Sequence, residues 1–279
     1  MSEGSQVLGL IAGAGRLPFL VAAGAEKAGL KVVCAGLSGS AEGELSDEVA
    51  EYFEVALARP GSWIRKLRKY GVTSTVMVGR VAKTQLFTPF RILRYLPDLR
   101  AMKIWYWTLR GRDKRNDTLL CALADELAKG GIILEDSTKY CKEHLADKGL
   151  MTKHKPPVGV ESDIEFGWGL VKKLGELDIG QALAVKEREV IAVEAIEGTE
   201  EMIVRAGRYC KKGGWTLIKV AKPKQDLRFD VPCVGTETIK GLADNGGRCL
   251  VVEAGKVIIL DKPETLALAD KLGIAVIGR

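Results

Sequence analysis

Residues 7–18 read VLGLIAGAGRLP, and this stretch decides the fold of the N-terminal half. Its first six residues are mostly apolar and typical of a short buried strand, and the Gly-Ala-Gly that follows predicts a tight turn. Residues 18–29 then have helical spacing with a proline in the first turn, and residues 31–35 form a second apolar run. A strand, a helix and a second strand in this order predict the beginning of a parallel sheet.

The turn matches the glycine-rich motif of dinucleotide-binding proteins only in part. Gly13 and Gly15 fill the first two glycine positions, whereas Pro18 stands where the third belongs. The second strand also ends without the Asp or Glu that would bind a ribose hydroxyl. We therefore expect a tight turn that tolerates phosphate, and the pattern disfavours a nicotinamide-dependent oxidoreductase.

Apolar runs and helical segments continue to alternate up to a polar stretch that ends in Pro156 and Pro157. The expected strands are residues 52–57, 75–78 and 132–134, and the expected helices are residues 62–70, capped by Ser62, and residues 113–129. A double proline fits neither a helix nor a central strand. We therefore expect a Rossmann-like N-terminal domain over residues 1–150 and a second domain over residues 158–279.

The C-terminal half contains two pairs of apolar runs, each pair separated by a short polar turn. The pairs are residues 182–186 with 190–193, and residues 249–253 with 257–260. Each pair predicts a β-hairpin, and between them Thr199 would cap a helix over residues 200–210. Hairpins combined with helices indicate a mixed sheet, so the sequence predicts an α/β protein of two domains.

The composition narrows the chemistry. The six cysteines include no C-x-x-C pair, so we expect reduced and mostly buried thiols. Only two histidines are present, which argues against a histidine-rich dimetal site or a Ser-His-Asp triad and favours a hard cation on oxygen ligands. The sequence offers neither an apolar stretch long enough to span a membrane nor a basic leader, so we expect a cytoplasmic protein.

The net charge of +6 is unevenly spread. Residues 80–112, here called the basic and aromatic segment, contain eight Lys or Arg and one acid, Asp98, interleaved with Phe, Tyr and Trp. Such a surface could serve nucleic acid, an anionic membrane or an amphiphilic anionic substrate. The alternative is a helix pair whose aromatic side chains pack on the sheet.

Two loops that follow apolar runs gather most of the chemically useful side chains. They offer four carboxylates and four cations: Glu194, Glu197, Asp226 and Asp230 with Lys219, Lys222, Lys224 and Arg228. Carboxylates suit a divalent cation, and lysine or arginine neutralises phosphate oxygens. The backbone amides after Gly198 begin a helix, and such ends bind phosphate. We therefore expect a phosphate ligand held through a metal, the alternative being two solvated loops.

Four stretches resemble the UDP-2,3-diacylglucosamine pyrophosphatases of lipid A biosynthesis, of the type without a calcineurin-like dimetal site. They are residues 9–18, 178–182, 192–199 and 219–232. The resemblance covers nearly the whole chain. It implies a two-domain cytoplasmic hydrolase that holds its substrate between the domains and splits UDP-2,3-diacylglucosamine into UMP and 2,3-diacylglucosamine 1-phosphate (lipid X) with Mg²⁺. It also implies possible contact with the inner membrane and no nucleic-acid partner, and it leaves both a monomer and a homodimer open.

The resemblance and the chemistry of the side chains together assign roles. Asp226 is the essential acid and would hold the metal or position the nucleophile, Lys222 would neutralise a phosphoryl oxygen, and Gln225 would orient water. The candidate metal ligands are Asp226, Glu194 and Asp230. The expected substrate contacts are Gly13, Gly15, Arg16, Gln181, Glu197, Gly198, Thr199, Lys219 and Arg228.

Alternatives accompany several of these roles. Asp230, which precedes a Val-Pro pair, could simply organise a turn. One of Glu194 and Glu197 could form a salt bridge with Lys219 while the other binds the ligand. For the whole protein, the alternative to an enzyme is a non-catalytic binder of a sugar nucleotide or an acyl lipid.

Overall fold

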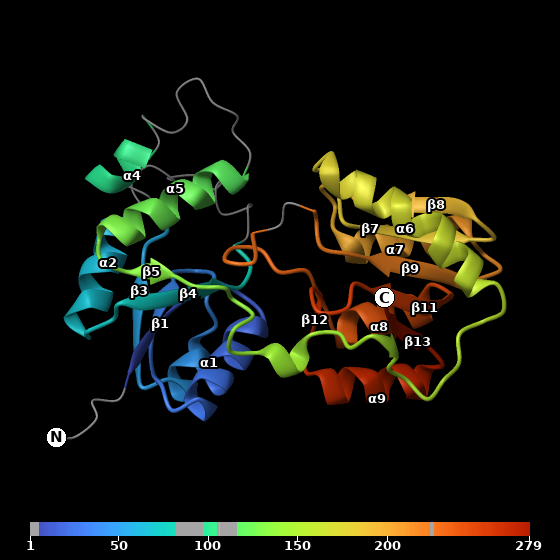
Figure 1. Cartoon of the computed structure of the whole chain (residues 1–279), viewed down its shortest axis with the longest axis horizontal. Helices are drawn as coiled ribbons and strands as arrows, with labels where there is room; N and C mark the ends of the chain where they lie inside the picture. The colour runs from blue at the N-terminus through green and yellow to red at the C-terminus, as the bar shows by residue number, and fades with distance from the viewer. Residues whose placement is uncertain (1–5, 82–96, 105, 107–115, 224–225) are drawn as a thin grey trace. The chain divides into compact units, whose positions relative to one another are not determined.

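The computed structural model describes residues 6–81, 97–104, 106, 116–223 and 226–279. The chain forms two compact units, each with its own sheet and core (Figure 1). The N-terminal unit comprises residues 1–141 and 226–230, and the C-terminal unit comprises residues 142–225 and 231–279. The first division therefore falls at residue 141, a few residues before the boundary expected from the double proline.

The N-terminal unit contains a five-stranded parallel sheet in the order β3-β2-β1-β4-β5, as the opening strand-helix-strand pattern predicts. The strands are β1 (Val7–Ala12), β2 (Lys31–Leu37), β3 (Glu51–Val55), β4 (Ser74–Val78) and β5 (Ile133–Leu134). The helices are α1 (Leu17–Lys27), α2 (Pro60–Lys69), α4 (Leu99–Lys103) and α5 (Asn116–Lys129), with a 3₁₀ helix, η1, over Gly43–Glu48. Figure 1 shows α1 on one face of the sheet and α2 with α5 on the other.

The core of this unit lies between the sheet and the α2–α5 layer. Ile11 and Val33 of the sheet pack with Trp63 and Leu67 of α2 and with Leu127 of α5. All five side chains are almost completely buried. Burying an aliphatic or aromatic side chain of this size stabilises a fold by roughly 1.5–3 kcal/mol, so this cluster anchors both helices to the sheet.

The glycine turn after β1 is occupied by the protein itself. A Cβ on Gly13 would lie 2.7 Å from the Arg80 carbonyl oxygen, so glycine is needed for the close approach of the loop after β4. Gly15 has a positive φ of 100°, and its N–H donates to Glu42 Oε1 at 3.0 Å. The Gly15 amide is therefore already paired with a carboxylate of the same unit.

The C-terminal unit contains a six-stranded mixed sheet in the order β6-β13-β11-β9-β7-β8. The strands are β6 (Gly149–Leu150), β7 (Ala182–Lys186), β8 (Glu189–Val193), β9 (Trp215–Lys219), β11 (Gly247–Val252) and β13 (Ala275–Gly278), and β10 (Cys233–Val234) pairs separately with β12 (Ile258–Ile259). The helices are α6 (Val160–Glu176), α7 (Thr199–Tyr209), α8 (Thr236–Asp244) and α9 (Lys262–Leu272). The predicted two-domain α/β fold with a mixed second sheet is therefore confirmed.

Both faces of this sheet are buried, and the alternation along β7 divides the two cores. Leu183 and Val185 face the cluster that includes Ile164 and Val171 of α6. Ala182 and Ala184 face the opposite cluster, which contains the apolar side chains of α7, α8 and α9. Because neighbouring side chains of a strand point to opposite faces, a continuous apolar run here serves two layers of helices.

Three local predictions were wrong. The first hairpin is present as β7 and β8, but the second is not, because β11 lies between β9 and β13 in parallel and β12 pairs with β10. Ser62 lies inside α2, which begins at Pro60 and has no side-chain cap. Cys121 is exposed, although Cys34, Cys141 and Cys249 are buried as expected.

None of the helices that the structure describes is long and apolar enough to cross a bilayer.

Candidate active site

The predicted essential acid belongs to a turn that packs on the N-terminal unit. Residues 226–230 are assigned to this unit although they lie far along the chain. Phe229 packs against the α2–α5 core, and Ser137 N donates to the Leu227 carbonyl at 3.1 Å. Ser137 Oγ also lies within hydrogen-bonding distance of the Arg228 and Met77 carbonyl oxygens, at 3.1 and 3.0 Å. Ser137 therefore connects the turn to the end of β4.

Asp226 and Arg228 form a bidentate ion pair within this turn. Asp226 Oδ2 lies 2.6 Å from Arg228 Nη2, and Asp226 Oδ1 lies 2.9 Å from Arg228 Nε. These hydrogen bonds from the Arg228 guanidinium lower the pKa of Asp226 below its ordinary value, despite partial burial. The side chains are 32% and 41% exposed, so the carboxylate is held ionised, oriented and open to solvent on one side.

A buried polar chain organises the other half of the predicted site, in the C-terminal unit. Lys219 Nζ, at the end of β9, donates to Thr199 Oγ1 at 2.9 Å and to the Cys233 carbonyl at 2.8 Å. Thr199 Oγ1 in turn donates to Glu194 Oε1 at 2.6 Å. All three side chains are buried. A buried cation and a buried carboxylate are thus linked through one hydroxyl, which fixes the ends of β8, α7 and β9 to each other.

This arrangement differs from two predictions. Thr199 does not cap α7: the cap position is held by Gly198 at a φ of 88°, and the Thr199 hydroxyl serves Glu194 and Lys219 instead. Neither Glu194 nor Glu197 forms a direct salt bridge with Lys219 in the described part of the chain. Glu197 pairs with Arg205 at 2.5 Å and accepts from its own loop amide, so it stiffens the loop before α7.

Gly180 and Gln181 both pack against Glu194. A Cβ on Gly180 would lie 2.0 Å from the Glu194 carbonyl oxygen, so only glycine allows this approach. Gln181 N donates to Glu194 Oε2 at 3.1 Å. The Gln181 side-chain oxygen is buried and has no hydrogen-bond partner among the described residues. A buried amide oxygen without a partner is unusual in a native fold, and it favours the expected contact of Gln181 with a ligand.

Lys222 is held at the edge of the same unit by a different acid. Its Nζ lies 2.5 Å from Asp178 Oδ1, and both side chains are about one third exposed, at 28% and 35%. Asp178 has a positive φ of 56°, which is unusual for a residue other than glycine. A Cβ on Gly175, in the last turn of α6, would lie 3.1 Å from Pro223. The residues at and just after the end of α6 therefore fix the position of the Lys222 ammonium group and of the backbone at Pro223.

Two charged residues clamp the peptide just before Lys222. Glu253 Oε2 accepts from Ala221 N at 3.0 Å, and Lys172 Nζ donates to the Ala221 carbonyl at 3.2 Å. Lys172 and Glu253 lie 2.5 Å apart, and Lys256 contacts the other Glu253 oxygen at 2.9 Å. Burial raises the pKa of Glu253, but the hydrogen bonds from the two lysines and from the Ala221 amide outweigh it, so the net shift is downward.

The structure places the remaining candidates as follows. Gly13, Gly15 and Arg16 lie at the start of α1, where the Arg16 guanidinium stands 5.4 Å from the Phe19 ring centroid. Asp230 is exposed and donates its backbone N–H to the Asp226 carbonyl at 3.3 Å, which fits its alternative role in a turn. Gln225 and Lys224 lie outside the described residues, as does most of the basic and aromatic segment.

Three supporting residues escaped the sequence argument. Ser137 carries no pattern that predicts a partner 91 positions away. Lys172 is one of several lysines on a helix. Glu253 could have been noticed, because it ends a buried apolar run just as Glu194 does, but that run was assigned to a hairpin.

A Thr199→Val variant tests the buried chain. Valine keeps the shape but leaves Lys219 and Glu194 without the hydroxyl that links them, so we expect the free energy of unfolding to fall by about 2–4 kcal/mol. Urea unfolding followed by circular dichroism measures this. Thr199→Ser keeps the hydroxyl and is expected to lose less than about 1 kcal/mol. Equal stability of the valine variant and the parent would contradict the assigned role.

Both units of the chain match models of known protein domains. A model of the LpxI N-terminal domain matches residues 7–144, and a model of the LpxI C-terminal domain matches residues 147–277. The chain is also 32% identical over 279 residues to the UDP-2,3-diacylglucosamine pyrophosphatase LpxI of Caulobacter vibrioides. That similarity covers 97% of this chain and 96% of the Caulobacter protein, so it extends over nearly the whole length of both.

Proposed function

We propose, from the premise that this chain belongs to the LpxI family, that it hydrolyses the pyrophosphate bond of UDP-2,3-diacylglucosamine in lipid A biosynthesis. The observation that carries this is the 32% identity, over nearly the full length of both proteins, with a pyrophosphatase of that name. Water adds across the P–O–P bridge, one P–O bond breaks, and the products are UMP, 2,3-diacylglucosamine 1-phosphate and a proton. The location of the substrate between the domains stays a prediction.

The described side chains support this chemistry. The pyrophosphate carries negative charge, and Lys222, Arg228 and Lys219 supply cations near the ends of the quoted motifs. Asp226 is ionised and oriented by Arg228, as a residue that holds a metal or positions water must be. The buried side-chain oxygen of Gln181, which has no partner among the described residues, could accept a hydrogen bond from a donor group of the ligand. We propose the remaining contacts, from Gly13, Gly15, Arg16, Glu197, Gly198 and Thr199 and the water-orienting role of Gln225, on the same motifs.

Mg²⁺ is part of the same proposal. Asp226 and Asp230 are two carboxylates of one turn, and hard oxygen ligands suit this ion. Both oxygens of Glu194 accept hydrogen bonds from Thr199 and Gln181, and both oxygens of Asp226 accept from Arg228. Glu194 is nevertheless the weakest of the three ligand candidates, because it is buried whereas the Asp226 side chain is 32% exposed. Within the described residues no three acids, histidines or cysteines gather as a ligand set, so we assign no step of the reaction to the ion.

Incubation of the purified protein with UDP-2,3-diacylglucosamine tests the proposal. We expect UMP release in the presence of Mg²⁺ and at least about a hundredfold slower release after chelation, restored by added Mg²⁺. In H₂¹⁸O, mass spectrometry shows which phosphorus water attacks, and the family resemblance favours label in the sugar phosphate rather than in UMP. Binding of the substrate without any UMP release would instead support the alternative, a non-catalytic sugar-nucleotide or acyl-lipid binder.

The proposal extends to where the enzyme works. Its substrate carries two acyl chains, which favour a bilayer, so we propose a cytoplasmic protein that touches the inner membrane peripherally. The basic and aromatic segment is the expected contact, although most of it lies outside the described residues. A homodimer is also part of the prediction, and the mass measured in solution decides between it and a monomer.

A further inference from the structure

A groove in the N-terminal unit is lined by arginine side chains that are not all paired with acids of the described residues. It has a volume of about 590 Å³ and is lined by α2 and by the start of α4. The lining residues are Gly61, Ile64, Arg65, Arg68, Asp98, Leu99 and Arg100. Three guanidinium groups therefore face a single carboxylate. No residue of the predicted active site lines this groove.

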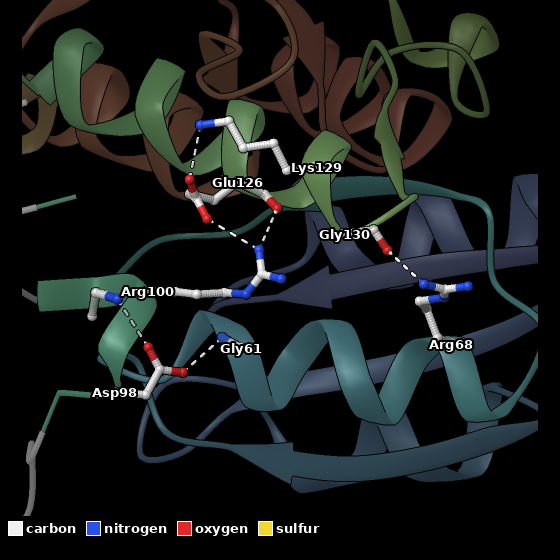
Figure 2. A network of polar contacts seen from close by, with 8 residues as sticks. Gly61, Arg68, Asp98, Arg100, Glu126, Lys129 and Gly130 are labelled. Atoms are coloured by element: carbon white, nitrogen blue, oxygen red, sulfur yellow. Dashed lines mark hydrogen bonds and ion pairs between the residues drawn. The ribbon is translucent and has the colours of Figure 1, made fainter. Parts of the chain in front are cut away.

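The carboxylates around the groove are already satisfied (Figure 2). Asp98 accepts from Gly61 N at 2.7 Å and from Ala101 N at 2.9 Å, so both its oxygens hold α4 against the start of α2. Glu126 of α5 is buried and binds Arg100 at 3.0 Å and Lys129 at 2.9 Å. Arg100 therefore has a structural partner, and neither acid is available to Arg65 or Arg68.

The guanidinium groups of Arg65 and Arg68 are available to bind an anion. They lie three positions apart on α2, which places them on the same side of the helix. Arg68 donates to the Gly130 carbonyl at 3.4 Å (Figure 2). Neither Arg68 nor Arg65 has a carboxylate partner among the described residues. Both side chains are exposed. Two neighbouring guanidinium groups with unused donors match the geometry of a phosphate.

One exposed apolar side chain lines the groove together with these cations, and a second follows it three positions later in the same helix. Leu99 lines the groove and is 84% exposed, and Met102, one helical turn later in α4, is 54% exposed. Exposed apolar side chains do not help to bind a soluble phosphate. Single-stranded nucleic acid would instead need aromatic stacking surfaces, and no aromatic residue is among the described residues that line the groove. At a bilayer surface, by contrast, guanidinium groups bind lipid phosphates while leucine and methionine enter the boundary with the acyl chains.

We propose that this groove, through Arg65, Arg68, Leu99 and Met102, is the site at which the protein docks on the phosphate headgroups of an anionic bilayer. The inference rests on the proposed peripheral membrane contact and gives it named residues. It concerns binding rather than hydrolysis.

Flotation of the full-length protein with vesicles tests the site. We expect the protein to float with vesicles that contain phosphatidylglycerol and not with phosphatidylcholine alone. Arg65→Glu combined with Arg68→Glu should weaken binding at least about thirtyfold, since each basic residue near an anionic surface contributes about a factor of five. Leu99→Ser with Met102→Ser should weaken it less, by about tenfold. Thermal unfolding of each variant verifies that it is folded.

A matched control separates this site from general attraction of a basic protein. Lys211→Glu with Lys212→Glu makes the same change in net charge on exposed residues of the C-terminal unit and should leave vesicle binding within about threefold of the parent. Equal losses in both double variants, no binding by the parent, or displacement of the parent by millimolar inorganic phosphate or by RNA would each overturn the proposal. Because no substrate is present, such a failure is distinct from a failure of the parent to release UMP.

Discussion

Replacing Asp226 by asparagine is expected to slow UMP release at least about a hundredfold while the protein stays folded. Asparagine keeps the size of the side chain and can still accept a hydrogen bond from Arg228, so the turn over residues 226–230 should survive. The negative charge is lost, and with it the ability to hold a cation or to polarise water. Initial rates of UMP release at saturating substrate measure the effect, and calorimetry on the unreacted substrate measures binding.

Two further substitutions show whether the effect belongs to this carboxylate. Asp47→Asn makes the same chemical change on an exposed acid of η1, and its rate should match that of the parent. Asp230→Asn distinguishes a metal ligand from a turn residue: a ligand would raise the Mg²⁺ concentration needed for half-maximal rate, whereas a turn residue would lower stability and leave that concentration unchanged. An active Asp226→Asn variant would remove Asp226 from the reaction.

Replacing Glu253 by glutamine is expected to lower both the stability of the protein and its rate of turnover. The buried carboxylate holds Lys172, Lys256 and the Ala221 amide, and a neutral amide cannot satisfy both lysines. We expect the free energy of unfolding to fall by about 2–3 kcal/mol. Because the clamp sets the peptide before Lys222, kcat should fall about tenfold with little change in KM. Urea unfolding and steady-state kinetics provide the two measurements.

The stabilising effect of Glu253 is expected to depend on pH. The pKa of Glu253 is lower in the folded protein than its ordinary value, so its stabilising effect is fully present above the ordinary carboxyl pKa and is lost as pH falls through the folded value. The stability difference between parent and Glu253→Gln should therefore be largest near neutral pH and shrink in acid. Lys256→Gln, which removes only an exposed partner, should cost less than about 0.5 kcal/mol. A difference that is constant with pH would show that packing, not charge, is responsible.

Local pattern predicted most of the N-terminal unit because its strands are short, apolar and separated by helices. Residues 7–12 form β1 as expected, and Gly13 is needed for close packing. The failure came in the C-terminal unit, at the pair of runs on either side of Gly255. Two apolar runs around a glycine satisfy the pattern of a hairpin. In the structure, however, β11 pairs in parallel with β9 and β13 instead of with the run after Gly255, and local periodicity does not show which strand will be the partner.

The motifs predicted which side chains of the C-terminal unit lie together more reliably than how these side chains are bonded. Thr199, Lys219 and Glu194 do lie together, because β8 and β9 run in the same direction on either side of β7 and therefore end on the same side of the sheet. Their bonding pattern differs from expectation, since a hydroxyl between a buried lysine and a buried glutamate satisfies both groups, whereas helix capping would satisfy only one amide. The Asp226 turn was expected to belong to the C-terminal half, and its packing on Ser137 and the α2–α5 core places it with the N-terminal unit.

The amino-acid sequence by itself determined the order of strands and helices, the α/β class and the family, because periodicity, turn chemistry and contiguous motifs depend on residues close together in the chain. Only the tertiary structure decided which partner each charge has. Lys172 meets Glu253 across 81 positions, and Asp98 meets Gly61 across 37. Such pairs depend on how strands are ordered in a sheet and how helices pack on it, and burial then decides whether the pair is held as a clamp or left to solvent.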